Sequence, residues 1–270
     1  MTNKPKKEIL KIKLKYENGD ADNHHLDLYD ASISFQGFSK AIAITTHAFL
    51  NKGEIRTKGN SISGGRIFLE TSKQGSFEQL ISIVYENPIY SGLAATALWE
   101  AIKYTWNRVM NIDYSTTNKK IIERIEPYFD DLEVALETPL FEAHRPIRTD
   151  ETIRINISSP RKEGSINLNR QSLQSVEIQK SNKIIDNIQG NVTRYNNITH
   201  VGKFFDESLD HTISFNAESL SQSEKEILSW SLHESNGDPK NGKIALSALP
   251  TYCAKNKLKR YTFIHVEKII

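Results

Sequence analysis

The sequence has little cysteine, no long apolar run and no recognisable catalytic motif. Its single cysteine, Cys253, cannot form an internal disulfide, and a chain of 270 residues without such bridges is typical of a reducing compartment. Cys253 lies between Tyr252 and Ala254, a setting that favours a small buried hydrophobe over a nucleophile. Residues 1–7 are polar and basic and do not resemble an export signal. We therefore expect a cytoplasmic protein.

The most apolar segment, residues 89–110, is too short to cross a membrane. Glu100, Lys103 and Arg108 interrupt it and leave only residues 87–99 without charge, whereas a spanning helix needs about 20 apolar residues. We expect no membrane span and interpret the segment as a buried or self-associating helix. Small residues that would permit close approach of two such helices are Gly92, Ala94, Ala95 and Ala97.

No constellation of residues satisfies the requirements of a catalytic or metal site. His24 and His25 lie between acidic residues, but adjacent histidines on a strand would point to opposite faces, and no second ligand cluster follows at a standard spacing. The loop at residues 59–65 lacks the phosphate-binding and nucleophile-elbow spacings. We therefore favour a protein without catalytic residues, metal or cofactor, and keep a cryptic metal-dependent nuclease or hydrolase as the weakest alternative.

Neither sign of charge dominates, since 35 basic residues face 33 acidic ones and the formal net charge is +2. Bulk electrostatics therefore neither require nor exclude nucleic acid. Near the end of the chain, basic and aromatic residues cluster in a pattern that suits a phosphate backbone with a stacked base. The members of this patch are Tyr252, Lys255, Lys257, Lys259, Arg260 and Tyr261. The alternative is a solvated charged face, which is what most charge runs are.

Hydrophobic periodicity predicts an α+β fold. Residues 1–149 are expected to form an N-terminal β-α-β-β-β-α domain with an antiparallel sheet and long helices. In residues 10–16, apolar side chains alternate with lysines, as on a half-buried strand. A helix is expected from Tyr29, with Asp30 as its cap, and a long helix after residue 88. Three strands are expected between them, at residues 54–58, 66–70 and 76–85. A later helix at residues 118–137 is expected to break at Pro127 and to be followed by a bend at residues 138–146.

Residues 150–270 are expected to form a second domain, a small β-barrel with one helix. Candidate strands lie at residues 184–195, 201–205, 211–215, 244–249 and 258–266. The helix, around residues 220–231, has Ser221 and Ser223 as cap candidates and Glu224 in its first turn. Five strands with a helix between the third and the fourth is the order of an OB-like barrel, a fold that binds nucleic acids, oligosaccharides and proteins.

Three segments resemble an uncharacterised family of bacterial proteins of unknown function. They are HLDLYDASISFQGFSKAIAITTHAFL, GSFEQLISIVYENPIYSGLAATALWEAIKY and NIQGNVTRYNNITHVGKFFD. The resemblance implies one architecture with a C-terminal small barrel, and it assigns no reaction and no active site. It also implies an accessory component of a multi-gene bacterial system, such as antiviral (phage) defence.

These observations favour a binding or assembly module that is not an enzyme and that forms a homo-oligomer or binds a partner protein. The alternative, from a different class, is a nucleic-acid-binding protein that acts through the C-terminal barrel.

Overall fold

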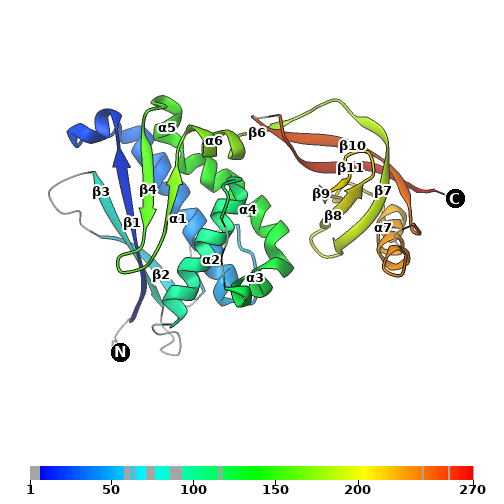
Figure 1. Cartoon of the computed structure of the whole chain (residues 1–270), viewed down its shortest axis with the longest axis horizontal. Coiled ribbons are helices and arrows are strands. Elements are labelled where there is room, and N and C mark those ends of the chain that lie inside the picture. The colour runs from blue at the N-terminus through cyan, green and yellow to red at the C-terminus, as the bar shows by residue number, and fades with distance from the viewer. Residues whose placement is uncertain are drawn as a thin grey trace. The chain divides into compact units, whose positions relative to one another are not determined.

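The computed structural model describes residues 7–57, 62–63, 65–70, 77–85, 93–114, 116, 118–238, 240–254 and 256–269 (Figure 1). The chain divides into two compact units, an N-terminal unit of residues 1–176 and a C-terminal unit of residues 177–270. The N-terminal unit combines helices with an antiparallel sheet, and the C-terminal unit is a small barrel, so the predicted α+β fold class is confirmed.

The N-terminal sheet is built around the first strand of the chain. β1 (Lys7–Glu17) pairs on one side with β3 (Glu78–Tyr85) and on the other with β4 (Arg154–Ser158). The outer strands are β2 (Gly65–Glu70) beside β3 and β5 (Ser165–Leu168) beside β4, and all pairs are antiparallel. Leu10, Ile12, Leu14 and Tyr16 of β1 are buried. Lysines fill the other face, where Lys11 pairs with Glu70 and Lys13 with Glu78, so the alternation in the sequence is confirmed.

The boundary between the units lies later than the sequence suggested. The β4–β5 hairpin follows residue 149, yet it belongs to the N-terminal sheet because β4 completes the hydrogen bonding of β1. The short helix α6 (Arg170–Val176) then ends the N-terminal unit. The expected strand at residues 54–58 is wrong for residues 54–57, which form no strand, and Lys58 lies outside the described residues.

Helices cover the buried face of this sheet (Figure 1). The long ones are α1 (Leu28–Leu50), α2 (Leu93–Val109) and α4 (Phe129–Ala143), and the shorter ones are α3 (Lys119–Ile125) and α5 (Arg145–Thr149). Asp27, rather than Asp30, caps α1 by accepting the Asp30 N–H. Single 3-10 turns lie at Gly19–Asn23 and at Glu126–Tyr128.

Proline has opposite effects at two positions in the helical layer. The turn that contains Pro127 separates α3 from α4, as predicted. The predicted bend at residues 138–146 is wrong except at His144, because α4 continues through Pro139 to Ala143 and α5 begins at Arg145. Gly37 of α1 lies so close to the backbone of Pro139 and Ala143 that a methyl group would overlap both. This close packing holds the proline-containing turn against α1.

The C-terminal unit is a closed five-stranded barrel. Its strands are β7 (Ile185–Asn196), β8 (Val201–Asp206), β9 (His211–Asn216), β10 (Ile244–Cys253) and β11 (Leu258–Lys268). β7, β8 and β9 form an antiparallel meander, β9 pairs in parallel with β11, and β10 joins β11 back to β7. The helix α7 (Gln222–Ser235) lies between the third and fourth strands in sequence, so the predicted OB-like barrel is confirmed.

Aromatic rings fill the barrel. Phe215 and Phe263 stack with centroids 4.3 Å apart, and Phe204 meets Phe263 edge-on at 5.8 Å. A sixth strand, β6 (Ile178–Lys180), extends the sheet beside β10. Ser221 and Glu224 form the capping box that starts α7, which fits their predicted places in the first turn.

Candidate nucleic-acid interface on the barrel

Three basic residues form a row across the outer face of the barrel. Arg194 of β7 is the register partner of Lys203 of β8, Lys203 is the partner of Ser214 of β9, and Ser214 is the partner of Arg260 of β11. Residues opposite each other on neighbouring strands lie on the same face of a sheet. We call Arg194, Lys203 and Arg260 the basic row. Within it, the Lys203 ammonium donates to the Ser214 hydroxyl at 2.8 Å.

Burial shows that the basic row faces outward. The neighbouring register line consists of Gly202, Phe215 and Tyr261, and all three are buried. Successive residues of a strand point to opposite faces. Because Gly202 and Tyr261 face the core, their strand neighbours Lys203 and Arg260 face outward. The basic side chains themselves are half-buried, as expected for long side chains lying along the barrel wall.

The position of the row agrees with the surface that OB folds use for ligands. In that fold, the second and third strands and the loops after the first and fourth strands bind oligonucleotides and oligosaccharides. Here those loops are residues 197–200 and 254–257. Arg194 lies near the first loop and Arg260 near the second, with Lys203 on the second strand between them. Ile198 at the first loop is 84% exposed.

The patch predicted from the sequence overlaps the basic row only in part. Arg260 belongs to both, and Lys259 beside it is half-buried, while Lys257 is exposed in the loop before β11 and Tyr252 is half-buried on β10. Lys255 lies outside the described residues. The described residues of the predicted patch lie at or near the loop between β10 and β11.

Tyr261 must be removed from that patch. Its ring is only 3% exposed, and its hydroxyl donates to the buried Asp206 carboxylate at 2.8 Å. Burial and this carboxylate both raise the pKa of Tyr261 above its ordinary value. The residue is therefore part of the barrel core and cannot stack on a base, because its neighbour Arg260 already occupies the outward direction.

An aromatic residue that the sequence analysis missed lies on the outer face instead. Phe205 follows Lys203 by two positions on β8, so both point to the same side. It is half-buried, and its register partners are Asn191 on β7 and Thr212 on β9. The sequence signal was the pair Phe204 and Phe205, of which a strand can bury only one.

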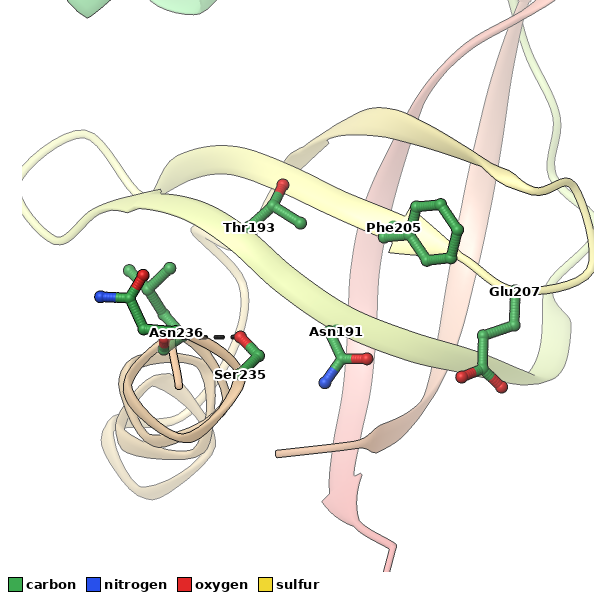
Figure 2. Close-up of a pocket in the computed structure, with 7 residues that line it drawn as sticks. Asn191, Thr193, Phe205, Glu207, Ser235 and Asn236 are labelled. Carbon is green, nitrogen blue, oxygen red and sulfur yellow. Dashed lines mark hydrogen bonds between the residues drawn. The ribbon is translucent and has the colours of Figure 1, made fainter. Parts of the chain in front are cut away.

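A cavity of about 360 Å³ opens beside Phe205 (Figure 2). Residues from β7, β8 and the end of α7 line it, together with one residue that follows β8. The lining residues are Asn191, Thr193, Phe205, Glu207, Leu232, Ser235 and Asn236. The outer face therefore combines a row of cations with an aromatic ring and an adjoining hollow.

Comparison with known proteins identifies the N-terminal unit. Residues 12–177 match a family described as a domain of unknown function, DUF7946, and this match covers more than half of the 270 residues. The chain belongs to this family. The match ends where the N-terminal unit ends, so the barrel lies outside it, as does the third segment of the resemblance, residues 187–206. No curated protein and no solved structure matches the chain.

We call the matched region, residues 12–177, the family domain. It contains the small residues that suggested self-association. Ala95 of α2 is 7% exposed and belongs to the core of the domain, and Ala97 packs against that core. Gly92 and the side chain of Ala94 lie outside the described residues. The alanines whose side chains are described are thus already in contact with their own chain, and self-association through them stays a prediction.

A histidine and a serine approach each other inside the family domain, but in a structural setting. His144 Nε2 lies 2.7 Å from Ser172 Oγ, and both residues are buried. Burial lowers the pKa of His144 to about 4, although a hydrogen bond with the Leu140 carbonyl opposes that shift. Ser172 also belongs to the turn that starts α6, where its N–H donates to Asn169. We interpret the pair as a link between α4 and α6.

Over the residues that the structure describes, no three His, Cys, Asp or Glu side chains gather closely enough to hold a metal ion. In the same part of the chain, no helix combines the length and the apolar character needed to cross a membrane.

Proposed function

We propose that the chain is a binding module without catalytic residues, and that its barrel binds single-stranded nucleic acid across the basic row. The observation that carries this proposal is the register that aligns Arg194, Lys203 and Arg260 on one outer face. Cations spaced across neighbouring strands can contact successive phosphates of one strand, and phosphate contacts supply most of the affinity of non-specific binding.

Phe205 favours a single strand over a duplex. It lies on the same face as Lys203, next to the row, and an aromatic ring can stack only on a base that is not paired inside a duplex. Such stacking contributes about 1–3 kcal/mol per base. A groove that combines cations with an aromatic ring is the general pattern of proteins that bind single strands without strong sequence preference.

The test compares two variants that lose the same charge from different surfaces. The row variant carries Arg194→Gln, Lys203→Gln and Arg260→Gln. The control variant carries Lys11→Gln, Lys13→Gln and Lys15→Gln on the exposed face of β1, where the lysines form ion pairs with glutamates. Such surface ion pairs contribute little to stability, about 0–1 kcal/mol each.

Fluorescence anisotropy with labelled single-stranded DNA and RNA gives the readout. The unchanged chain and the control variant are expected to bind with similar affinity, and the row variant to bind at least about tenfold more weakly, since each phosphate contact adds to affinity. Equal binding by both variants would assign the affinity to net charge alone, and an unchanged chain that does not bind would refute the proposal.

Assembly is the second part of the binding-module interpretation. Attachment of the family domain to a partner protein, a homo-oligomer, and a place in a multi-component antiviral system all stay predictions. Native mass determination of the purified chain tests the oligomer: a defined dimer or larger species supports it, and a monomer at all concentrations contradicts it.

A further inference from the structure

The cavity beside Phe205 has two apolar walls and a polar interior. The apolar lining residues are Phe205 from β8 and Leu232 from α7, and the polar lining includes Asn191, Thr193 and Ser235. Figure 2 shows the close-up of the cavity. The volume of about 360 Å³ is near the lower end of ordinary ligand sites, which extend over roughly 300–1,000 Å³. Apolar walls with polar groups between them suit a flat ring that presents hydrogen-bonding atoms along its edge.

Hydrogen bonds within the barrel determine which polar atoms remain as acceptors. The Asn191 amide donates to the Asn241 carbonyl at 2.6 Å, which fixes its orientation and makes Oδ1 the acceptor. The Thr193 hydroxyl donates to the Lys203 carbonyl at 3.3 Å. The Ser235 hydroxyl donates to the Val192 carbonyl at 3.3 Å or to the Leu232 carbonyl at 3.4 Å. A hydroxyl has only one proton to donate, so these two oxygens offer lone pairs to a ligand.

Glu207 adds a carboxylate at one end of the cavity. Its Oε1 is paired with the Lys243 ammonium at 2.5 Å, and an ionised carboxylate accepts hydrogen bonds through both oxygens. At the opposite end, the exposed Asn236 turns its amide away from Asn191 and Glu207 (Figure 2). The cavity is therefore rich in acceptors.

The hydrogen-bonding groups that line the cavity distinguish between the bases. Guanine presents two adjacent donors, N1–H and the N2 amino group, which one carboxylate can accept together. Adenine and cytosine place an acceptor beside their amino group, and thymine and uracil place carbonyls on both sides of N3–H. A carbonyl directed at an acceptor loses its hydrogen bonds to water without replacement, at a cost of about 1–3 kcal/mol.

We propose that this cavity is a guanine-base site and that Glu207 is the residue that selects guanine. The proposal deepens the proposed function and rests on it for the strand that would bring the base to the cavity. Because Phe205 lines the cavity and also lies beside Lys203 on β8, a strand that crosses the basic row can place one base in the cavity.

The experiment measures anisotropy with two labelled strands of about twelve nucleotides, a length within the site size of an OB fold. One strand is oligothymidylate, and the other carries a single central guanine. The guanine is expected to tighten binding about tenfold, in the lower part of the range for one specifically read base. Glu207→Gln is expected to abolish that preference, so that the variant binds the two strands with equal affinity.

Glu226→Gln is the matched control, since Glu226 is an exposed acid of α7 that does not line the cavity. It removes the same charge from the same unit and is expected to keep the guanine preference. Circular dichroism melting of both variants checks that they fold. Loss of the preference in both variants, or in neither, would refute the selective role of Glu207.

Free guanosine and adenosine monophosphates separate this proposal from the proposed function. If oligothymidylate does not bind, the proposed function fails, and the cavity is still tested by a rise in melting temperature with the guanosine nucleotide that Glu207→Gln removes. A response to the free nucleotide alone would assign the site to a soluble guanine nucleotide. Absence of guanine preference in both forms, strand and free nucleotide, would overturn the proposal.

Discussion

Arg194 of β7 lies directly opposite Lys203 of β8, so that two cations occupy neighbouring positions on one face of the barrel. Two cations at paired positions of neighbouring strands can contact adjacent phosphates of one bound strand, which is why we place the ligand here.

Replacing Lys203 with methionine tests this relationship. Lys203→Met removes a charge and the bond to Ser214, while it keeps a long apolar side chain. The lost hydrogen bond is expected to lower the free energy of unfolding by about 0.5–1.5 kcal/mol. Binding to single strands is expected to weaken.

Lys225→Met provides the control for that substitution. Lys225 lies on α7, where its ammonium donates to the Glu218 carbonyl, so the change also removes one charge and one hydrogen bond from the barrel. Denaturant unfolding and anisotropy are measured on both variants. The interpretation of Lys203 fails if its variant binds as well as the Lys225 variant does.

Gly37 is expected to be indispensable for the packing of α1 on α4. A methyl group at this position would overlap the backbone of Pro139 and Ala143, and overpacking of this kind costs about 1–3 kcal/mol. Gly37→Ala should therefore destabilise the family domain by that amount. Gly237→Ala is the control, because nothing lies within 4 Å of a methyl group there. A Gly37→Ala variant as stable as the unchanged chain would contradict the close contact.

Tryptophan fluorescence can follow the family domain alone. The chain has 3 tryptophans; Trp99 and Trp106 are buried in the family domain, and Trp230 is on α7 of the barrel. In a Trp230→Phe background, the change of fluorescence with denaturant therefore reports unfolding of the N-terminal unit only. We expect the Gly37→Ala effect to appear fully in this background.

His144 should make the family domain sensitive to acid. Its pKa is about 4 in the folded chain, against about 6.5 when unfolded. Between these values the unfolded state binds more protons, so stability is lost as pH falls from about 6.5 to about 4, by at most about 3 kcal/mol. His144→Asn is expected to lower stability at pH 7 and to flatten this part of the profile.

The control for this substitution is His25→Asn, which replaces an exposed histidine of the same domain and removes no buried group. Denaturant unfolding at several pH values, in the Trp230→Phe background, gives the comparison. If the His144 variant keeps the slope of the unchanged chain between pH 4 and 6.5, other groups cause the acid sensitivity.

Local patterns were sufficient to predict several parts of the fold. The lysines and apolar residues of β1 alternate as its two faces require, and Ser221 with Glu224 begins α7. The order of strands and helix in the barrel was also readable, because each strand carries its own period-two signal. The boundary between the two units could not be predicted in this way, because it depends on the pairing of β4 with β1, which are far apart in the chain.

The candidate site also depends on contacts between residues that are far apart in the chain. Arg194, Lys203 and Arg260 are single basic residues on three strands, and only the register brings them together. The sequence patch was chosen by proximity along the chain, which joined Arg260 with Tyr261 although neighbours on a strand face opposite sides. Alternation alone would have separated those two residues. No sequence pattern indicated the cavity, because its walls come from β7, β8 and α7.

The salt dependence of single-strand binding tests the central claim most directly. Each phosphate contact on a single strand contributes about −0.7 to the slope of log affinity against log salt, so a basic row of three cations predicts a slope of about −2. The Arg194, Lys203 and Arg260 triple variant should bind weakly with a slope near zero, and the Lys11, Lys13 and Lys15 variant should keep the slope of the unchanged chain. The same slope in both triple variants, or no binding by the unchanged chain at low salt, would contradict the account.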